Sequence, residues 1–249
     1  TDVTNTKGEN ATGGKIELKG NGSVGMFAEG GTLKNAGNIK LAGTESTYGI
    51  FAKDNSSVTN ETTGVIELES ATSKRVANVG IFNKTSEKAV TNNGKIKMKD
   101  NSFGIMSKNV ILGANSLLEL GKDGVGIYSK GITGANSTLT LNAGSTIKLA
   151  SSDNSGVGVL TEGTVTTTIT ANGNIEIGDN GYGIISRTPG SITTGVTSTA
   201  KLGKNSIYLV SENGASIDNN TVLTSEKDET KGLYTKGGRI NNNADINFG

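Results

Sequence analysis

The chain has 249 residues and a formal net charge of +1 at pH 7, with 24 lysines and arginines against 23 aspartates and glutamates. It contains no cysteine, which excludes disulfides, thiolate metal sites and cysteine nucleophiles, and its balanced charge gives no support to a nucleic-acid or membrane-surface role. With 37 glycines, no tryptophan, five phenylalanines and five tyrosines, it has too few large apolar side chains for an ordinary globular core.

The first unit of a repeat lies near the N-terminus. A triplet of an apolar, a charged and an apolar residue, Ile16-Glu17-Leu18, is followed by a polar turn and by Gly25-Met26-Phe27. An aliphatic residue with two polar ones, Leu33-Lys34-Asn35, completes the unit. Alternate side chains of a strand point to opposite faces, so the aliphatic residues of the triplet should point inward and the charge outward. Each unit thus predicts three short strands.

The triplet recurs in eight successive units, and the sign of its central charge alternates. In chain order the triplets are Ile16-Glu17-Leu18, Ile39-Lys40-Leu41, Ile66-Glu67-Leu68, Ile96-Lys97-Met98, Leu118-Glu119-Leu120, Ile147-Lys148-Leu149, Ile175-Glu176-Ile177 and Ala200-Lys201-Leu202. In parallel strands stacked in register, each outward charge would lie about 4.8 Å from its neighbours. Opposite charges would attract there by about 0.2–1 kcal/mol per pair. The alternation therefore indicates parallel stacking in register.

Glycine followed by an aliphatic and often an aromatic residue marks the second strand. Its copies are Gly25-Met26-Phe27, Gly49-Ile50-Phe51, Gly80-Ile81-Phe82, Gly104-Ile105-Met106, Gly126-Ile127-Tyr128, Gly158-Val159-Leu160, Gly183-Ile184-Ile185 and Gly232-Leu233-Tyr234. We assign Ser206-Ile207-Tyr208 to the same position, with serine in place of glycine. Strand parity predicts that the third residue of each copy points outward and that Val24, Met26 and Ala28 point inward.

The third strand ends on asparagine in several units. The copies are Leu33-Lys34-Asn35, Val58-Thr59-Asn60, Val90-Thr91-Asn92, Ile217-Asp218-Asn219 and Ile240-Asn241-Asn242. Two interpretations are open. The asparagines either stack as a ladder of side-chain amides or take left-handed turn conformations.

Three strands in a unit of roughly 25 residues predict an all-β fold, a three-sided parallel β-helix of about ten coils. We expect it to be right-handed, as about 98% of parallel crossovers are. Frequent glycine and the absence of a 3.6-residue apolar period disfavour helices. Residues 1–249 are predicted to form a single segment, with loops near 71–79, 131–140 and 225–231. Neither end resembles a cap and no signal peptide is present, so we expect a fragment of a longer protein.

Few residues suggest catalysis. The lack of histidine removes the commonest general base and metal ligand, and no cofactor or metal site is predicted. The segment Gly20–Gly25 matches a dinucleotide-binding pattern but precedes no helix. Asp100, Asp123, Asp153 and Asp179 recur before successive glycines, either as a catalytic or cation-binding strip or as turn formers, and we favour turn formation. We therefore expect no enzymatic activity.

One surface stands out as a candidate binding site. Two residues after the outward aromatic position lies a charged residue, which is lysine in four successive units. The candidate ridge consists of Phe51, Lys53, Phe82, Lys84, Lys108, Tyr128 and Lys130. Aromatic rings beside lysines would suit an acidic glycan or a protein partner. The alternative is a corner of the shaft that lysine stems cover. Glu212 departs from this pattern, because it lies two positions further from the aromatic residue, Tyr208, than the other charged residues do.

The Gly-Ile-Phe/Tyr motifs, the Ile-Lys/Glu-Leu triplets and the Val-Thr-Asn-x-Gly turns resemble the passenger domains of type V autotransporters. The composition, rich in asparagine and lysine, is most similar to the large fusobacterial adhesins of the RadD type. The resemblance covers essentially the whole chain, but no binding residues carry over. It implies a parent protein anchored by an outer-membrane barrel and displayed on the surface of a Gram-negative bacterium.

The same resemblance implies attachment to a protein or glycan on a host cell or partner bacterium. We therefore expect an adhesin passenger segment that acts as a rigid shaft with a possible binding face. Two alternatives stay open: a glycan-active β-helix enzyme of the polysaccharide lyase or hydrolase type, and a surface rod that assembles with copies of itself.

Overall fold

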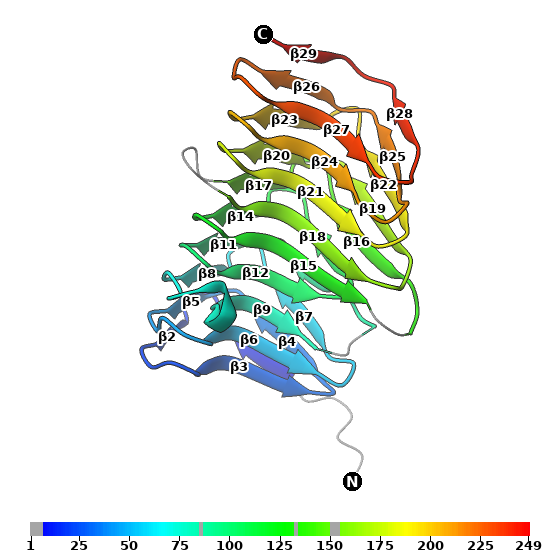
Figure 1. Cartoon of the computed structure of the whole chain (residues 1–249). Coiled ribbons are helices and arrows are strands. Elements are labelled where there is room, and N and C mark those ends of the chain that lie inside the picture. Colours follow the sequence, from blue (N-terminus) through cyan, green and yellow to red (C-terminus); the bar gives the residue numbers. More distant parts are fainter. Residues whose placement is uncertain (1–6, 85–86, 132–133, 150–154) are drawn as a thin grey trace.

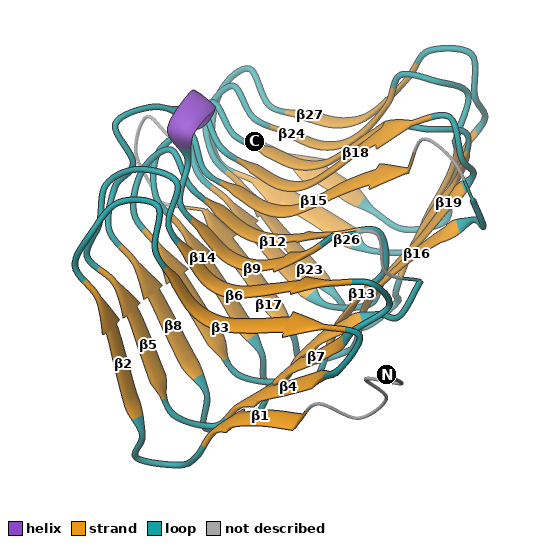
Figure 2. Cartoon of the chain, turned by 90° about the horizontal axis from the view of Figure 1, so that it is seen from below, coloured by secondary structure: helices purple, strands orange, loops and turns teal. Residues whose placement is uncertain are grey.

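The computed structural model describes residues 7–84, 87–131, 134–149 and 155–249. Within them the chain coils into a parallel solenoid, and its strands form three sheets of ten, ten and nine strands (Figure 1). Seen from below, the three sheets form walls around a common interior (Figure 2). This confirms the predicted three-sided parallel β-helix of about ten coils. Its right-handed sense stays a prediction.

The three sheets are named here after the residues that distinguish them. The asparagine sheet contains β1 (Lys7–Asn10), β4 (Thr32–Asn35), β7 (Ser57–Asn60), β10 (Val90–Asn92), β13 (Val110–Leu112), β16 (Ser137–Leu141), β19 (Thr167–Ala171), β22 (Gly190–Thr194), β25 (Ser216–Asn219) and β28 (Ile240–Asn242). The triplet sheet contains β2 (Lys15–Leu18), β5 (Asn38–Leu41), β8 (Val65–Leu68), β11 (Lys95–Met98), β14 (Leu117–Leu120), β17 (Thr146–Leu149), β20 (Asn174–Ile177), β23 (Thr199–Leu202), β26 (Val222–Ser225) and β29 (Ile246–Phe248). The aromatic sheet contains β3 (Val24–Glu29), β6 (Tyr48–Lys53), β9 (Val79–Asn83), β12 (Phe103–Ser107), β15 (Val125–Gly131), β18 (Val157–Gly163), β21 (Tyr182–Arg187), β24 (Ile207–Ser211) and β27 (Lys231–Thr235).

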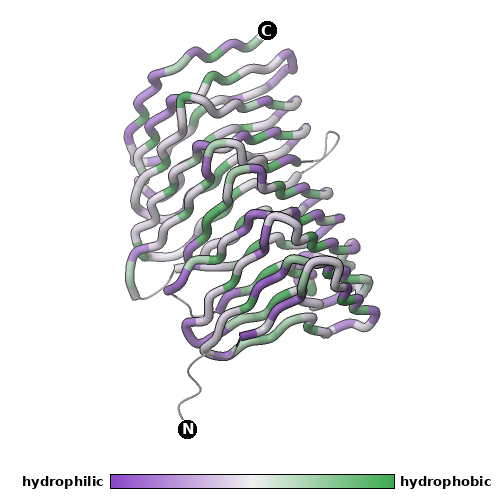
Figure 3. Tube along the Cα trace, turned by 180° about the vertical axis from the view of Figure 1, so that it is seen from behind, coloured by the Kyte–Doolittle hydropathy of each residue, from purple (hydrophilic) through white to green (hydrophobic). Residues whose placement is uncertain are grey.

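The aliphatic residues of the triplets build the core. The register pairs Ile39 with Ile66 and Ile66 with Ile96, and all three side chains are fully buried. The predicted interior column is confirmed along its length: Ile16, Ile39, Ile66, Ile96, Leu118, Ile147 and Ile175. The tube in Figure 3 shows hydrophobic and hydrophilic residues alternating along the strands. Each fully buried aliphatic side chain contributes about 1.5–3 kcal/mol, so the stacked column is a major source of stability.

The charges of the triplets form the predicted ladder on the outside. The register pairs Lys97 with Glu67 on one side and with Glu119 on the other. The same neighbour relation joins all eight members in order: Glu17, Lys40, Glu67, Lys97, Glu119, Lys148, Glu176 and Lys201. None of these side chains is buried. The alternation of sign along the sequence is therefore an alternation between neighbouring coils.

Replacing Lys97 with glutamate would place a third carboxylate between Glu67 and Glu119. We expect the free energy of unfolding to fall by up to about 1–2 kcal/mol at low salt, because two attractions become repulsions. The loss should shrink at high salt, which screens exposed charges. Urea unfolding at both salt concentrations measures it, with Lys97→Gln as a control that removes attraction without adding repulsion. A loss that does not depend on salt would contradict the ladder.

The asparagines of the third strand form a buried ladder of amides. Asn10 donates to Asn35, Asn35 to Asn60 and Asn60 to Asn92 through Nδ2–Oδ1 hydrogen bonds of 2.8, 2.8 and 2.7 Å. Positive φ values belong to other asparagines, namely Asn55, Asn101, Asn115, Asn180 and Asn205. Of the two open interpretations, the amide ladder is therefore confirmed.

One assignment in the aromatic sheet is wrong. The sequence pattern places Tyr208 at the outward aromatic position with Ser206 in place of glycine, but the register pairs Ile185 with Val210. Tyr208 therefore stands in the glycine position, and its side chain is fully buried. A shift of two residues keeps the alternation of inward and outward side chains, so parity alone does not detect it. In the corrected register Glu212 follows Val210 by two positions and is not displaced.

The connections agree in part with the predicted loops. Residues 69–78 carry the short 3₁₀ helix η1 (Lys74–Val76), and residues 226–230 join β26 to β27. The predicted loop at 131–140 is shorter, because β15 ends at Gly131 and β16 begins at Ser137, and residues 132–133 lie outside the described residues. No helix in the described ranges has the length and apolar character needed to cross a membrane.

Candidate binding face

The outer face of the aromatic sheet carries two columns of side chains. The ring of Tyr48 contacts the ring of Phe51 at a centroid distance of 5.5 Å, although the two residues are three positions apart. Ile50 between them is fully buried, so Gly49 and Ile50 together interrupt the alternation expected of a strand. Val24 is paired with Tyr48 and is 40% exposed. The prediction that Val24 points inward is therefore wrong, because it assumed unbroken alternation.

The register extends both columns over nine coils. The first outer column is Val24, Tyr48, Val79, Phe103, Val125, Val157, Tyr182, Ile207 and Lys231. The second outer column is Phe27, Phe51, Phe82, Met106, Tyr128, Leu160, Ile185, Val210 and Tyr234. Every member except Lys231 is aliphatic, aromatic or methionine. Neighbouring side chains bury Val79, Val125, Ile185 and Val210, and the other apolar members are half-buried or exposed. The second column was predicted in most coils, whereas the first was missed. Its signal in the sequence is the apolar residue directly before the glycine.

The other two sheets present mainly polar side chains to the outside. The triplet sheet carries the charge ladder, and the asparagine sheet aligns Thr140, Thr170 and Thr193 between buried neighbours. A parallel sheet that is apolar on both faces is typical of a sheet covered on both sides. Contiguous exposed apolar patches of several hundred Å² mark interaction sites. The outer face of the aromatic sheet is therefore the candidate binding face.

Aromatic rings pack against one another in the N-terminal half of this face. Phe27 and Phe51 stack with centroids 5.9 Å apart and planes 21° apart, and Tyr48 and Phe82 stack at 5.9 Å and 24°. Phe51 and Phe82 meet edge to face at 5.2 Å. Stacked rings from different coils cover one another's flat faces. These stacked rings form an aromatic layer in this half of the face.

A charged row borders the second outer column. Its members are Glu29, Lys53, Lys84, Lys108, Lys130, Glu162, Arg187, Glu212 and Lys236. The four lysines of the candidate ridge are therefore in successive coils, as predicted. Lys53 pairs with Glu29 at 2.9 Å and with Asp54 at 3.8 Å, and Lys108 pairs with both carboxylate oxygens of Glu87 at 2.7 Å. The hydrogen bond between Lys53 and Glu29 lowers the pKa of Glu29 and raises that of Lys53. Nearby carboxylates thus offset part of the basic run.

A polar network continues the row beyond the lysines. The hydroxyl of Tyr128 donates to Glu162 at 2.9 Å, and Arg187 donates to Glu162 at 3.0 Å and to Glu212 at 2.5 Å. Burial and the hydrogen bond to Glu162 raise the pKa of Tyr128 to about 12. Partial burial raises the pKa of Glu162, but hydrogen bonds from Arg187 and Tyr128 act in the opposite direction and hold it below its usual value. Glu162 is therefore a carboxylate at neutral pH.

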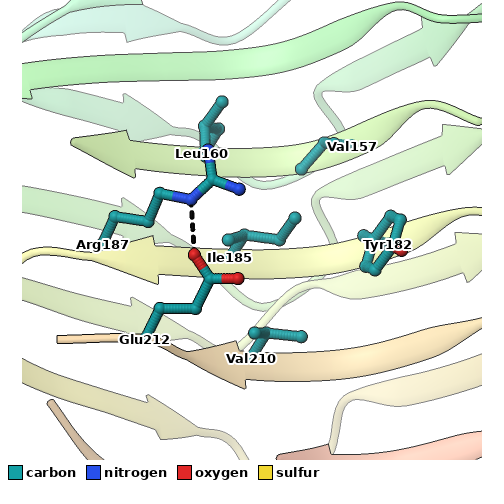
Figure 4. A pocket seen from close by; sticks show the side chains of 7 residues that line it. All are labelled: Val157, Leu160, Tyr182, Ile185, Arg187, Val210 and Glu212. Carbon is teal, nitrogen blue, oxygen red and sulfur yellow. Dashed lines mark hydrogen bonds and ion pairs between the residues drawn. The ribbon is translucent and has the colours of Figure 1, made fainter. Parts of the chain in front are cut away.

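An open pocket of about 260 Å³ lies beside this network, over β18, β21 and β24. Its lining residues are Val157, Leu160, Tyr182, Ile185, Arg187, Val210 and Glu212. Figure 4 shows Leu160, Ile185 and Val210 in the middle, with Tyr182 and Arg187 at opposite ends. The pocket forms where aliphatic side chains replace the rings of the N-terminal half.

A comparison with protein families finds one similarity. Residues 2–113 match the model of the BigA third pectate lyase-like domain, which corresponds to somewhat less than half of the chain. The matched part ends just after β13 and includes the aromatic layer but not the pocket. Comparisons with curated proteins and with solved structures give no significant match. The similarity agrees with the β-helical fold, and the closer relation to RadD-type autotransporters stays a prediction.

The acidic column fits the turn interpretation. An Oδ1 oxygen of Asp100 and one of Asp179 each accept a 2.8 Å hydrogen bond from a backbone N–H in the next coil. Asp123 has a φ of 58°, the left-handed conformation of a turn residue. Asp153 lies outside the described residues. Among the residues that the structure describes, no three acidic side chains come close enough to hold a metal ion. Asp100 and Asp179 thus link neighbouring coils.

The Glu162 network should make stability depend on pH. A carboxyl whose pKa is lowered by folding stabilises the fold above its unfolded pKa, and this contribution is lost as pH falls through the folded pKa. Replacing Glu162 with glutamine should therefore cost at most about 1 kcal/mol near pH 7, as partly exposed ion pairs do. The cost should decline towards pH 3. Urea unfolding at both pH values measures it, with Glu226→Gln as a control of equal charge change. A constant cost would show that the carboxylate charge plays no part.

Proposed function

We propose that this chain is a segment of a bacterial surface adhesin, a rigid β-helical shaft that attaches through the outer face of its aromatic sheet. One observation carries the proposal: this face is apolar over eight consecutive coils, whereas the other two sheets are mainly polar outside. The similarity to a BigA domain supports a place at the bacterial surface. Display by an outer-membrane barrel of a Gram-negative parent protein belongs to the same proposal.

The size of the face suits a specific interface. Nine strands spaced by about 4.8 Å extend over about 40 Å, and the six positions from the first outer column to the charged row span about 16 Å. Their product, about 600 Å² before allowing for surface relief, approaches the roughly 800 Å² that each partner buries in a standard interface. The four lysines of the candidate ridge lie along one edge of this face, and its three aromatic residues belong to the second outer column. The lysines then act as a polar rim around an apolar centre, the usual arrangement of protein interfaces.

A glycan-active enzyme is the second candidate, because the matched family is described as pectate lyase-like. Glycoside hydrolysis uses one carboxylic acid that stays protonated, with a raised pKa. Glu162 accepts hydrogen bonds from Tyr128 and Arg187, and its pKa is lowered. This argues against a hydrolase at that site, whereas a lyase cleaves by elimination and does not need such an acid. Incubation with polygalacturonate tests the alternative, and cleavage products would replace the adhesin proposal with an enzymatic one.

The attachment face is tested by adding charge to it. Beads coated with the chain are measured for adherence to epithelial cells and to other bacteria. The double variant Phe51→Glu with Phe82→Glu should reduce adherence at least tenfold, because two carboxylates would be buried in an apolar contact. Thr140→Glu with Thr170→Glu adds the same charge to the outer face of the asparagine sheet, again in two adjacent coils, and should leave adherence unchanged. If the two variants adhere equally well, the aromatic sheet is not the attachment face.

A further inference from the structure

We infer that the pocket over β18, β21 and β24 is an anchor site for one aliphatic or aromatic side chain of a polypeptide partner. The inference rests on the proposed attachment face and names what one part of that face binds. The observations that carry it are the carbon-only floor of the pocket, its volume and the polar network at one end.

The floor excludes ligands that are polar all round. The side chains of Val157 and Leu160 are half-buried and those of Ile185 and Val210 are buried, so the carbon floor is small and lies next to the polar groups of Arg187 and Glu212. Tyr182 is the one aromatic side chain of the lining. A sugar ring carries hydroxyl groups on most of its carbons. A hydroxyl group that faces this floor would lose water without gaining a hydrogen bond, so a sugar ring can place only its C–H face there. An aliphatic or aromatic side chain loses no hydrogen bonds there.

The volume of the pocket also favours a single side chain as its ligand. Pockets that enclose drug-sized ligands measure about 300–1,000 Å³, and this one measures about 260 Å³. It has room for a single large side chain rather than for several sugar units. Single apolar side chains that fill such hollows are typical anchors of protein–protein interfaces.

The polar end of the pocket suits a peptide backbone. Arg187 donates from Nε to Glu212 and from one terminal nitrogen to Glu162, which leaves other N–H groups of the guanidinium for a ligand. The side chains of Arg187 and Glu212 are 45% and 40% exposed. A peptide unit has one carbonyl acceptor and one N–H donor. These groups complement the arginine and the glutamate, while the side chain beside them enters the apolar floor.

Binding is tested with blocked amino acids as probes. Methyl NMR of the full chain follows the signals of Val157, Leu160, Ile185 and Val210 during titration with N-acetyl-leucinamide or N-acetyl-phenylalaninamide. N-acetyl-serinamide and a trisaccharide of galacturonic acid serve as polar probes. We expect saturable shifts with the two apolar amides and none with the polar probes. Saturation by the trisaccharide alone, or by no probe, would overturn the inference.

A matched pair of variants tests the pocket itself. Leu160→Phe fills it with the residue that Phe51 and Phe82 provide in the same outer column, so the fold should tolerate it. Met106→Phe makes the equivalent change in a coil outside the pocket. Affinity for the apolar amides should fall at least tenfold in Leu160→Phe and stay unchanged in Met106→Phe. Equal affinity in both variants would contradict an anchor site.

The two proposals fail in different ways. If the Phe51→Glu, Phe82→Glu variant loses adherence while Leu160→Phe adheres like the parent, the attachment face stands and the anchor pocket falls. If the apolar amides saturate the pocket but the Phe51→Glu, Phe82→Glu variant adheres normally, the pocket binds side chains and the attachment face falls.

Discussion

Replacing Tyr208 with glycine should lower the free energy of unfolding by about 3–5 kcal/mol, as expected for removal of a fully buried aromatic side chain. The variant restores the residue that seven earlier coils carry at this position. In those coils the glycine is required, because a Cβ at Gly49 would lie 2.6 Å from the carbonyl oxygen of Gly80. The coil of Tyr208 departs from the pattern, so returning it to the pattern should destabilise it.

The reason lies in the triplet of the same coil. Its inner column holds Ala200 where the preceding coil holds Ile175 and the following one Leu223. Elsewhere an isoleucine methyl packs over the glycine, as with Gly158, whose added Cβ would lie 3.3 Å from Cγ2 of Ile147. In this coil alanine is the residue at that position, and we infer that the space left by its small side chain accommodates the ring of Tyr208. The small side chain at position 200 and the large one at position 208 thus compensate for each other in the core.

This compensation between Ala200 and Tyr208 is tested with a double variant. Ala200→Ile combined with Tyr208→Gly should recover at least about 2 kcal/mol of the loss, because the aliphatic side chain refills part of the cavity. Ala200→Ile alone should destabilise the protein through overpacking. Tyr208→Phe, which keeps the ring, should cost little. Urea unfolding of the parent and the four variants, followed by circular dichroism, provides the values. If the losses in unfolding free energy of the two single variants simply add in the double variant, the two sites are not coupled.

The sequence predicts the fold well because the core is set by a strict local pattern. The triplets specify strand, parity and register together: a slip by one residue would bury the charges, and a slip by one coil would place like charges side by side. The Tyr208 error shows the limit of the same reasoning. Ile207-Tyr208 resembles the outward motif, and only the volume missing at Ala200, on another wall of the coil, indicates the shift.

The candidate site was predicted only in part, for two physical reasons. The first outer column depends on a break in alternation at the glycine of each coil, which Gly49 and Ile50 illustrate and which a simple period of two does not contain. The pairing of Lys108 depends on a loop. Glu87, the partner of Lys108, lies in the connection between β9 and β10, whose path the repeat does not specify.

The asparagine ladder gives the second large effect. Replacing Asn60 with leucine should cost about 2–4 kcal/mol, because it leaves the Nδ2 of Asn35 and the Oδ1 of Asn92 buried without their ladder partners. Each buried polar group without a partner costs about 1–3 kcal/mol. Size is not the obstacle, since Leu112 and Leu141 occupy the same register in the following coils and are fully buried.

Asn92 provides the matched control, because it is the last member of this run. It accepts one ladder hydrogen bond, from Asn60, and its neighbour on the other side is Leu112. Leucine at position 92 would extend the leucine run by one coil and would break one ladder hydrogen bond, whereas leucine at position 60 breaks two. We expect about half the cost of Asn60→Leu in urea unfolding. Replacing all four asparagines of the run with leucine should cost less than four single losses, because partners are then removed together. Equal costs at positions 60 and 92 would mean that side-chain volume, and not the ladder of hydrogen bonds, decides which residue this column accepts.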